Sequence, residues 1–467
     1  MEYTEAKLAS ALPPGPRPSL LSSLVYWPGR NPLEFFTNIA RTYGDIAHVR
    51  LGGEHVFIVS DPRLIKDVLV THSRQFTKSR GLERTKRLLG EGLLTSEGAL
   101  HLRQRRLMQP AFHRDRVAGY AATMVEYAER LQKSWTDGAT LDVSREMNRL
   151  TLSVVGKTLF DADVESRAPE VGAALTGVME SFWMLMLPFS RAIEYLPLPR
   201  LRRSRRARKR LDAIIYGLIR ERRVSDADRG DLLSMLLLAQ DEEDEGRRMT
   251  DEQVRDEAMT IFLAGHETTA NALMWTWYLL SQNPGAERAL HEEVDRVLRG
   301  RRPTVADISA LPYVERVVTE SMRLYPPAWI VGRRAIEPYA MNGYTAPARA
   351  IVIMSQWIVH RDVRYYPEPE RFDPDRWTPA FKAALPPFAY FPFGGGPRRC
   401  IGESFAWMEL MLIVSTLAQR WRFELVADHP VLPQALITLR AKYGIKMVAR
   451  SRGVTSAHAH HQGGDCG

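Results

Sequence analysis

The stretch that decides the interpretation of this sequence is FPFGGGPRRCIG, residues 391–402. It holds one of only two cysteines in the chain, Cys400; the other, Cys466, is the second-last residue. The three consecutive glycines, 394–396, release the backbone from steric limits and allow it to approach a flat ligand closely. An amphipathic helical pattern, GESFAWMELMLIVSTLAQRW, begins at Gly402. We therefore expect Cys400 to lie just before the N-terminus of a helix.

That position favours the ionised form of the cysteine. Free N–H groups and the positive end of the helix dipole stabilise an anion, so we expect a lowered pKa for Cys400, helped by Arg398 and Arg399. A thiolate is a ligand for iron. A zinc site would need further Cys or His at short spacing, and none is present. A nucleophilic cysteine would need a histidine base, which another part of the chain could supply, although nothing near Cys400 suggests it.

The pattern Phe393-x-x-Gly396-x-Arg398-x-Cys400-x-Gly402 resembles the haem-binding signature of the cytochrome P450 family. The resemblance runs from about Leu12 to Ala449. It implies a mainly α fold with small β-sheets, triangular in outline, with haem between a long distal helix and the helix that follows the cysteine. It implies haem b as cofactor and Cys400 as the ligand of its iron. The loop residues that it places against the cofactor are Phe393, Gly394, Arg398 and Gly402.

A helical pattern about 30 residues long, 251–282, opens with a capping box formed by Thr250 and Gln253. Its middle carries AGHETT, residues 264–269, and an acid with hydroxyls is unusual inside a core helix. A threonine hydroxyl bonded to a carbonyl one turn back would explain it without any function. The segment is also similar to the family's A/G-G-x-D/E-T-T, which covers the distal face of haem at a local bulge. The resemblance implies that Ala264 borders the cofactor, that Thr268 donates a hydrogen bond to bound dioxygen and that Glu267 helps to relay protons.

Two arginines and a glutamate are expected to support the cysteine loop from behind. Glu320 and Arg323 lie three residues apart, on one helical face, and Arg371 lies in a stretch rich in proline and aromatic residues, 361–393. As isolated residues they would be ordinary solvent-exposed charges. The resemblance places such residues in one buried network, which requires every charge to be paired. We assign Glu320, Arg323 and Arg371 this structural role.

Haem carries propionates, which need cations. His101 and Arg105 are four residues apart and resemble the family's W/H-x-x-x-R segment. Arg333, in Arg-Arg-Ala, is similar to the family's R-x-A strand, and Arg398 precedes the cysteine. Taken singly, each of these could be a solvated surface residue. The resemblance implies that His101, Arg105, Arg333 and Arg398 hold the propionates.

The remaining patterns predict one domain, residues 1–450, and a disordered His-rich tail, residues 451–467. Alternating strands with Gly52-Gly53 between them predict a β-hairpin over residues 45–59. Helical periodicity is found at 116–135, 211–223, 285–298 and 313–324. The run RLRRSRRARKR, 200–210, suggests either a nucleic-acid patch or the solvated start of a helix. We favour the second, since no aromatic residue is interleaved to stack on bases.

The chain of 467 residues carries a net charge of +9. It has no secretory signal and no run approaching the ~20 apolar residues of a membrane span, so we expect a soluble, cytoplasmic monomer. There is no room for a fused reductase, so electrons from NAD(P)H should arrive through a ferredoxin or flavodoxin and its reductase. Such proteins are often acidic, which suits the positive charge. Candidate docking residues are Arg103, Arg106 and Arg399.

The reaction implied by the resemblance inserts one atom of dioxygen into a hydrophobic substrate. A fatty acid, a terpenoid or a steroid would each fit an apolar pocket, for which the candidate lining residues are Phe262, Ala264, Ala328, Ile330 and Ile437, with Phe182 in the roof. A peroxide-driven peroxygenase or a rearranging enzyme on the same fold is an alternative, although the intact Glu267-Thr268 pair favours dioxygen activation. A haem-based sensor without turnover is a remoter one.

Overall fold

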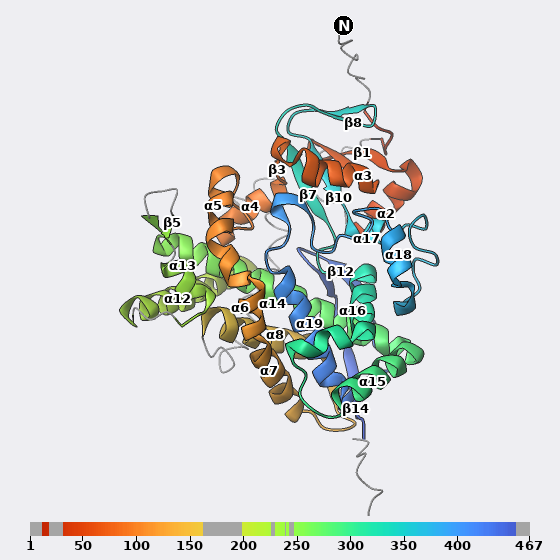
Figure 1. The fold of residues 1–467 in the computed structure, drawn as a ribbon. Helices are drawn as coiled ribbons and strands as arrows, with labels where there is room; N and C mark the ends of the chain where they lie inside the picture. The colour runs from red at the N-terminus through yellow and green to blue at the C-terminus, as the bar shows by residue number, and fades with distance from the viewer. Residues whose placement is uncertain are drawn as a thin grey trace, which may run out of the picture.

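The computed structural model of the chain describes residues 12–17, 31–161, 199–225, 229–238, 240–241 and 247–453. Figure 1 shows a small β region at one end and helices through the rest. The predicted Phe182, Cys466 and His-rich tail lie outside the described residues. Among the helices described, none is both long and apolar enough to cross a membrane.

Helix α14, Asp251–Gln282, runs through the middle of the helical region (Figure 1). The predicted capping box starts it: Gln253 N donates to the Thr250 hydroxyl over 3.2 Å, and Thr250 N donates to the Gln253 side chain over 3.0 Å. The helix ends at the residue before Asn283, and Pro284 begins the next one. Most of α14 is buried because α8, α12, α16 and α19 pack around it.

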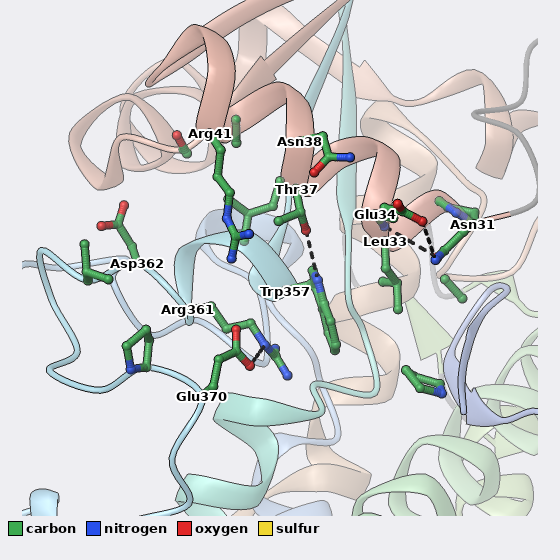
Figure 2. Close-up of a pocket in the computed structure, with 18 of the residues that line it drawn as sticks. Asn31, Leu33, Glu34, Thr37, Asn38, Arg41, Trp357, Arg361, Asp362 and Glu370 are labelled. Atoms are coloured by element: carbon green, nitrogen blue, oxygen red, sulfur yellow. Dashed lines mark hydrogen bonds and ion pairs between the residues drawn. The ribbon is translucent and has the colours of Figure 1, made fainter. Parts of the chain in front are cut away.

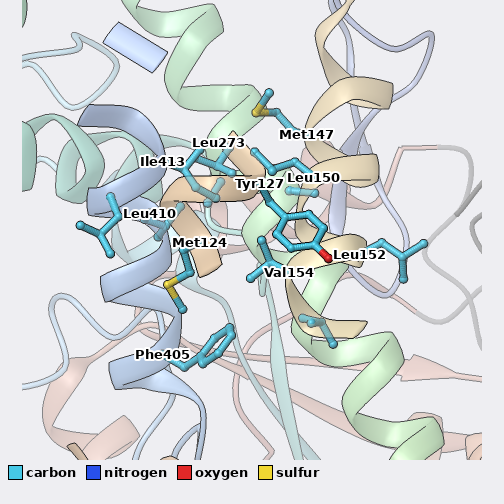
Figure 3. Packing of buried hydrophobic residues seen from close by; sticks show 14 of the residues in the cluster. Met124, Tyr127, Met147, Leu150, Leu152, Val154, Leu273, Phe405, Leu410 and Ile413 are labelled. Atoms are coloured by element: carbon cyan, nitrogen blue, oxygen red, sulfur yellow. The ribbon is translucent and has the colours of Figure 1, made fainter. Parts of the chain in front are cut away.

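The apolar core lies where α7, α8, α14 and α19 meet. Figure 3 shows Met124 and Tyr127 of α7 among side chains of the three neighbouring helices. The buried faces repeat every three or four residues, as in Leu150 and Val154 of α8. Helix α19, which follows Cys400, enters this core with Phe405, Leu410 and Ile413, so its N-terminal end, next to Cys400, is anchored by packing.

The helices have the following bounds: α2 Pro32–Tyr43, α3 Pro62–Lys66, α4 Arg80–Leu89, α5 Gly98–Met108, α6 Arg114–Gly119, α7 Ala121–Lys133, α8 Val143–Phe160, α12 Pro199–Ser225, α13 Leu232–Leu238, α15 Pro284–Leu298, α16 Pro312–Leu324, α17 Gln356–Val359, α18 Pro379–Ala384 and α19 Glu403–Ala418. Two predictions needed revision. The pattern at 116–135 is divided between α6 and α7, and the pattern at 211–223 belongs to the longer α12, which includes the basic run.

A five-stranded sheet has the order β1-β2-β10-β7-β3. The predicted hairpin is confirmed: β1 (Ile46–Leu51) and β2 (Glu54–Val59) pair antiparallel, and Gly52 and Gly53 take φ values of 54° and 78° in the turn. The strand β10 (Ile351–Met354) is parallel to β2 and antiparallel to β7 (Val331–Ala335), which also pairs with β3 (Phe76–Lys78). This brings Lys78 opposite Arg333.

The smaller sheets are β11-β14-β4 and three two-stranded pairs, β12-β13, β5-β6 and β8-β9. Their bounds are β4 Thr140–Asp142, β5 Gln240–Asp241, β6 Arg247–Arg248, β8 Tyr339–Met341, β9 Tyr344–Ala346, β11 Trp421–Leu425, β12 Pro433–Ala435, β13 Leu439–Ala441 and β14 Lys446–Ser451.

The glycines before Cys400 serve packing within the protein. Gly396 has φ +66°, and a Cβ there would lie 1.9 Å from the carbonyl oxygen of Leu69. Leu69 belongs to a π-helical turn, η1 (Asp67–Thr71), which therefore presses its backbone directly onto the cysteine loop. Gly394 has φ +70° with open space around its Cα, so there only conformation requires glycine.

We predict that Gly396→Ala destabilises the protein by about 2–5 kcal/mol, since it adds the strain of a left-handed residue to a backbone clash. The matched control is Gly343→Ala, at φ +83° with no atom near its Cβ, which should cost only about 1–2 kcal/mol. Urea unfolding of both variants measures the difference. Equal losses in the two variants would contradict the close approach of Leu69.

Candidate haem-thiolate site

Cys400 lies between a short 3-10 turn, η6 (Gly396–Arg398), and α19, whose N-cap is Gly402. Its backbone N–H donates to the Phe393 carbonyl over 3.0 Å, which closes the loop. The side chain has exposed surface, yet protein surrounds it closely enough that burial raises the pKa of its thiol to about 11.

The expectation of a lowered pKa for Cys400 is therefore wrong in direction. Two of the predicted causes are present, because a hydrogen bond from the Gly402 backbone and the charge of Arg399 both lower the pKa, and Arg105, which was not predicted, lowers it as well. Removal from water outweighs them. The sequence showed the local charges but not how deeply the chain would enclose the sulfur. Direct coordination by a metal ion overrides such a shift, since a coordinated thiol is deprotonated.

The segment 264–269 of α14 is continuous helix, without the local bulge that the resemblance implied. Thr268 donates its hydroxyl to the Ala264 carbonyl over 2.7 Å, and Thr269 donates to Gly265 over 3.3 Å. These are bonds to a carbonyl one turn back, the alternative that the sequence left open. Thr151 of α8 donates to the His266 carbonyl over 2.9 Å, so this turn of α14 is also tied from outside.

Glu267 does not share a hydrogen bond with Thr268. Its side chain is 1% exposed and points to the hairpin of β12 and β13. Its Oε1 accepts hydrogen bonds from Thr438 and from Nε of Arg440. Its Oε2 is buried and has no hydrogen-bond partner. Sequence reasoning missed Thr438 and Arg440, because they lie more than 170 positions along the chain and carry no motif.

Three of the predicted propionate contacts form one buried cluster. Arg333 is 6% exposed and His101 is 5% exposed. Burial and the nearby charge of Arg398 lower the pKa of Arg333 to about 10. Burial and the charges of Lys78 and Arg398 lower the pKa of His101 to about 4. Two members were not predicted. Lys78 donates to the carbonyls of residues 93 and 96, and Glu97 pairs with Arg398 over 2.6 Å.

This cluster fits the propionates of haem. Arg333 and Arg398 carry two positive charges, and Lys78 a third when it is protonated, against the single negative charge of Glu97. Burial, with the charges of Arg398 and Arg333, lowers the pKa of Lys78 to about 7, so an anion in the cluster would favour its charged form. Two buried donor atoms, Nε of Arg398 and Nε2 of His101, have no hydrogen-bond partner. An anionic ligand would supply both the missing charge and the missing acceptors.

Arg105 takes a different position from the other three. It donates to the Arg399 carbonyl over 2.8 Å and interacts electrostatically with Cys400. It therefore lies beside the cysteine loop, on the same side as the sulfur. The propionate role predicted for Arg105 stays a prediction.

Behind the loop, Glu320 and Arg323 form a fully buried ion pair, 2.8 Å apart and 0% exposed. The predicted third member differs. The side chain of Arg371 is 62% exposed and pairs with Glu368, and only its backbone carbonyl contacts Arg323. The buried position belongs to Arg376, which is 6% exposed and donates to Glu320 over 3.0 Å. The 3-10 turn η5, Pro374–Arg376, turns this side chain inward.

The predicted pocket residues divide into two groups. Phe262 is 3% exposed and stacks on Phe160 with ring centroids 4.2 Å apart, so little of its surface is free for a substrate. The other four, Ala264, Ala328, Ile330 and Ile437, are partly exposed. Ile330 and Ile437 pack against two different core clusters, and the indole of Trp329 donates to the Leu436 carbonyl over 3.0 Å, which fixes this part of the hairpin.

A cavity of about 1370 Å³ lies farther out, between α2, residues 357–364 and the β12 strand. Figure 2 shows Arg361 paired with Glu370 and Trp357 donating to Thr37 across it. Ala435 and Leu436 line its inner wall, so it reaches the outer face of the hairpin that carries Ile437.

We predict that Arg376→Gln destabilises the protein by about 3–5 kcal/mol, because it leaves buried Glu320 without one of its cations. Arg371→Gln should change stability by no more than about 1 kcal/mol, since the pair that it breaks is exposed. Chemical denaturation of both variants makes the comparison. A larger loss for Arg371→Gln would restore the network expected from the sequence.

A buried acid of α19 adds a pH dependence. Burial raises the pKa of Glu409, which is 0% exposed and near Thr269, to about 8. The unfolded chain ionises this carboxyl above about pH 4.3. Between the two values the unfolded state binds fewer protons, so the contribution of Glu409 to stability falls as pH rises.

We therefore predict that the free energy of unfolding of the wild type falls relative to that of Glu409→Gln between about pH 5 and pH 8, by up to ~1.4 kcal/mol per unit. Denaturant titrations of the haem-loaded proteins at several pH values measure it. Glu315→Gln, at a side chain 48% exposed, is the control and should show no such slope. A flat difference for Glu409→Gln would contradict the raised pKa.

Comparison with known proteins places this geometry in context. A family model described as Cytochrome P450 matches residues 13–447. Cyclooctatin synthase of Streptomyces melanosporofaciens is 41% identical over 414 residues, covering 88% of this chain and 90% of that protein. Pentalenene oxygenase of Streptomyces avermitilis is 35% identical over 429 residues, covering 91% and 94%. The crystal structure of the cytochrome P450DA heme domain matches with a TM-score of 0.85 at 28% identity, covering 95% of this chain and 98% of that one. The expected fold class is confirmed.

Proposed function

This chain belongs to the cytochrome P450 family and is a monooxygenase by class, and we propose that it inserts one atom of dioxygen into a terpenoid, with Cys400 as the ligand of haem iron. The observation that carries the proposal is the combination of Cys400, which has exposed surface, with a buried cation cluster that lacks negative charge. Family membership implies a haem-thiolate cofactor. When bound, haem supplies the redox-active iron, and a thiolate ligand favours O–O cleavage.

The residues of the chain would orient the cofactor from two sides. The sulfur of Cys400 would bind the iron. Arg333 and Arg398, with Lys78 of the same cluster, would neutralise the propionates, and the uncharged His101 would donate a hydrogen bond to one of them. Because these cations are buried and held by backbone carbonyls, they are positioned before the ligand arrives, which favours tight binding.

Thr268 and Glu267 would transfer protons on the side of the site opposite Cys400. The Thr268 hydroxyl, partly exposed, donates to the Ala264 carbonyl in the structure and would be able to give its hydrogen bond to the co-substrate instead. Glu267 would restore the proton that Thr268 passes on. The free Oε2 of Glu267 supports this role, since it leaves one oxygen of the carboxylate available.

The proposal of a terpenoid rests on the relatives, since Ala328, Ile330 and Ile437 would suit a fatty acid or a steroid equally well. Two relatives, 41% and 35% identical, have names that refer to cyclooctatin and pentalenene. A pocket lined by small and branched apolar side chains binds a compact hydrocarbon mainly through burial of apolar surface.

Electrons would come from a ferredoxin or flavodoxin reduced by NAD(P)H. The candidate docking residues are Arg399, beside Cys400, and Arg103 and Arg106 in α5, the helix whose Arg105 contacts the cysteine loop. Leu102 of the same helix is 59% exposed. An exposed apolar side chain surrounded by arginines suits a partner with an acidic rim and an apolar centre.

We predict that the dithionite-reduced, carbon monoxide-bound protein shows a Soret band at the long wavelength typical of thiolate-ligated haem. Cys400→His should keep haem but move the band to the position of histidine ligation, because the ligand atom changes from sulfur to nitrogen. Cys466→Ser, at the only other cysteine, is the control and should match the wild type. A histidine-type band in the wild type, or an unmoved band in Cys400→His, would remove the basis of the proposal.

Turnover then tests the reaction. With a ferredoxin, its reductase, NAD(P)H and isotopically labelled dioxygen, one labelled oxygen atom should enter a terpenoid substrate that also shifts the haem spin state. Product formed with peroxide but not with dioxygen and electron donors would instead establish a peroxygenase.

A further inference from the structure

The β12–β13 hairpin sends a charged side chain to the buried acid of α14. Arg440, in β13, donates from Nε to Oε1 of Glu267, and Thr438 donates to the same oxygen. The side chain of Glu267 is 1% exposed, whereas that of Arg440 is 21% exposed. Arg440 thus spans the distance from the interior to the surface, and the carboxylate at its inner end has one oxygen held and one oxygen, Oε2, free.

The position of Arg440 is fixed by the hairpin around it. The indole of Trp275, in α14, donates to the Leu439 carbonyl over 3.1 Å, and Leu439 N donates to the Pro327 carbonyl over 3.0 Å. These bonds hold the strand on both sides of the residue that precedes Arg440. The contact with Glu267 is therefore a built feature of two packed elements.

Thr438 can give its only proton to Glu267. Asn271, one turn along α14, donates its side-chain amide to the Thr438 hydroxyl oxygen over 3.2 Å. Because that oxygen accepts from Asn271, its own hydrogen is directed to Oε1 of Glu267. Both groups from the hairpin thus act as donors, an arrangement that stabilises the ionised carboxylate.

The charge balance around Glu267 depends on Arg440. The neighbouring ionisable group on α14 is His266, which interacts electrostatically with both residues. Its side chain is buried, and burial lowers its pKa, so it stays neutral at pH 7. Among the described groups around the carboxylate, Arg440 forms the one ion pair with Glu267. An ionised carboxylate without a cation is unstable in such a place.

We propose that Arg440 is a positioning residue of the monooxygenase site, which keeps Glu267 ionised and directs one of its oxygens toward the surface. Glu267 then accepts one proton from water on the solvent side of Arg440, which itself stays protonated, and gives one toward Thr268 through its free oxygen, Oε2. The carboxylate returns to its starting form, so protons balance. The relay rests on the proposed function, whereas the ionised state of Glu267 does not.

The test replaces Arg440 and observes the carboxyl group directly. In infrared spectra of the haem-loaded protein at pH 7, Arg440→Gln should show an additional protonated-carboxyl band, beside that of Glu409, which burial keeps protonated in the wild type as well. The additional band should disappear in Glu267→Gln/Arg440→Gln, which assigns it to Glu267. Arg452→Gln is the matched control, because Arg452 is 17% exposed but its partner, Asp295, is 43% exposed and stays hydrated. Arg440→Lys, which keeps the charge, should resemble the wild type.

Product formed per NAD(P)H consumed gives a second readout. It should fall roughly tenfold in Arg440→Gln, as for other outer residues that orient a reacting group, and recover as pH rises and Glu267 ionises again. No additional band in Arg440→Gln, or an additional band that survives in the double variant, would overturn the inference. Absence of turnover in the wild type, with the additional band still present in Arg440→Gln, would instead overturn the proposed function and leave the ionisation of Glu267 established.

Discussion

A single buried carboxylate, that of Glu320, sets the path by which the chain reaches its cysteine. It accepts hydrogen bonds from Arg323, from Arg376, from the indole of Trp377 and from the backbone N–H of Asp373. Each donor comes from α16 or from the meander, the proline- and aromatic-rich segment 361–393, so this one group joins a helix to a segment that has little regular structure of its own. Arg323 continues the network by donating to backbone carbonyls of the meander. Removal of the carboxylate would leave two buried cations unpaired, which explains why charges are retained in a place where apolar packing would otherwise serve.

The network extends to the cysteine loop through its aromatic neighbours. Phe391 N donates to Nε2 of His360 over 3.0 Å, and the hydroxyl of Tyr390 donates to the Thr319 carbonyl over 3.1 Å. The loop is thus held at its start by these bonds and at its end by α19. Between these points, the close approach of Gly396 to η1 leaves no room for the backbone to move. Since effective ligands for a metal must be held rigidly, the buried charges of α16 and the meander contribute to the site without touching it.

The sequence predicted what local patterns encode. The capping box and full length of α14, the hairpin β1–β2 and the position of Cys400 before α19 all follow from spacing and residue type. The buried Glu320–Arg323 pair was expected from the family resemblance and not from spacing alone. Sequence reasoning failed where the answer depends on distant packing. Two tetrads, PERF at 369–372 and PDRW at 374–377, both offer an arginine before an aromatic residue, and only the 3-10 turn at Pro374 sends the second one inward. Lys78 was missed because only strand pairing brings it opposite Arg333, and the raised pKa of Cys400 depends on enclosure by the whole chain.

Buried polar atoms without a hydrogen-bond partner distinguish the Glu320 network from the functional site only when the balance of charge around them is considered as well. Buried atoms without a hydrogen-bond partner also occur in the apolar core, as at Nε1 of Trp277, so a missing bond alone indicates no function. Within the Glu320 network the two oxygens of the carboxylate are fully engaged. In the cation cluster, by contrast, missing acceptors at Arg398 and His101 coincide with excess positive charge, which an anionic ligand would correct. At Glu267, Oε2 has no hydrogen-bond donor, but Arg440 already balances the negative charge of the carboxylate. This free oxygen is therefore suited to exchange a proton and not to bind a permanent ion. The same physical rule, that buried charge must be balanced, thus assigns different tasks to the two halves of the site.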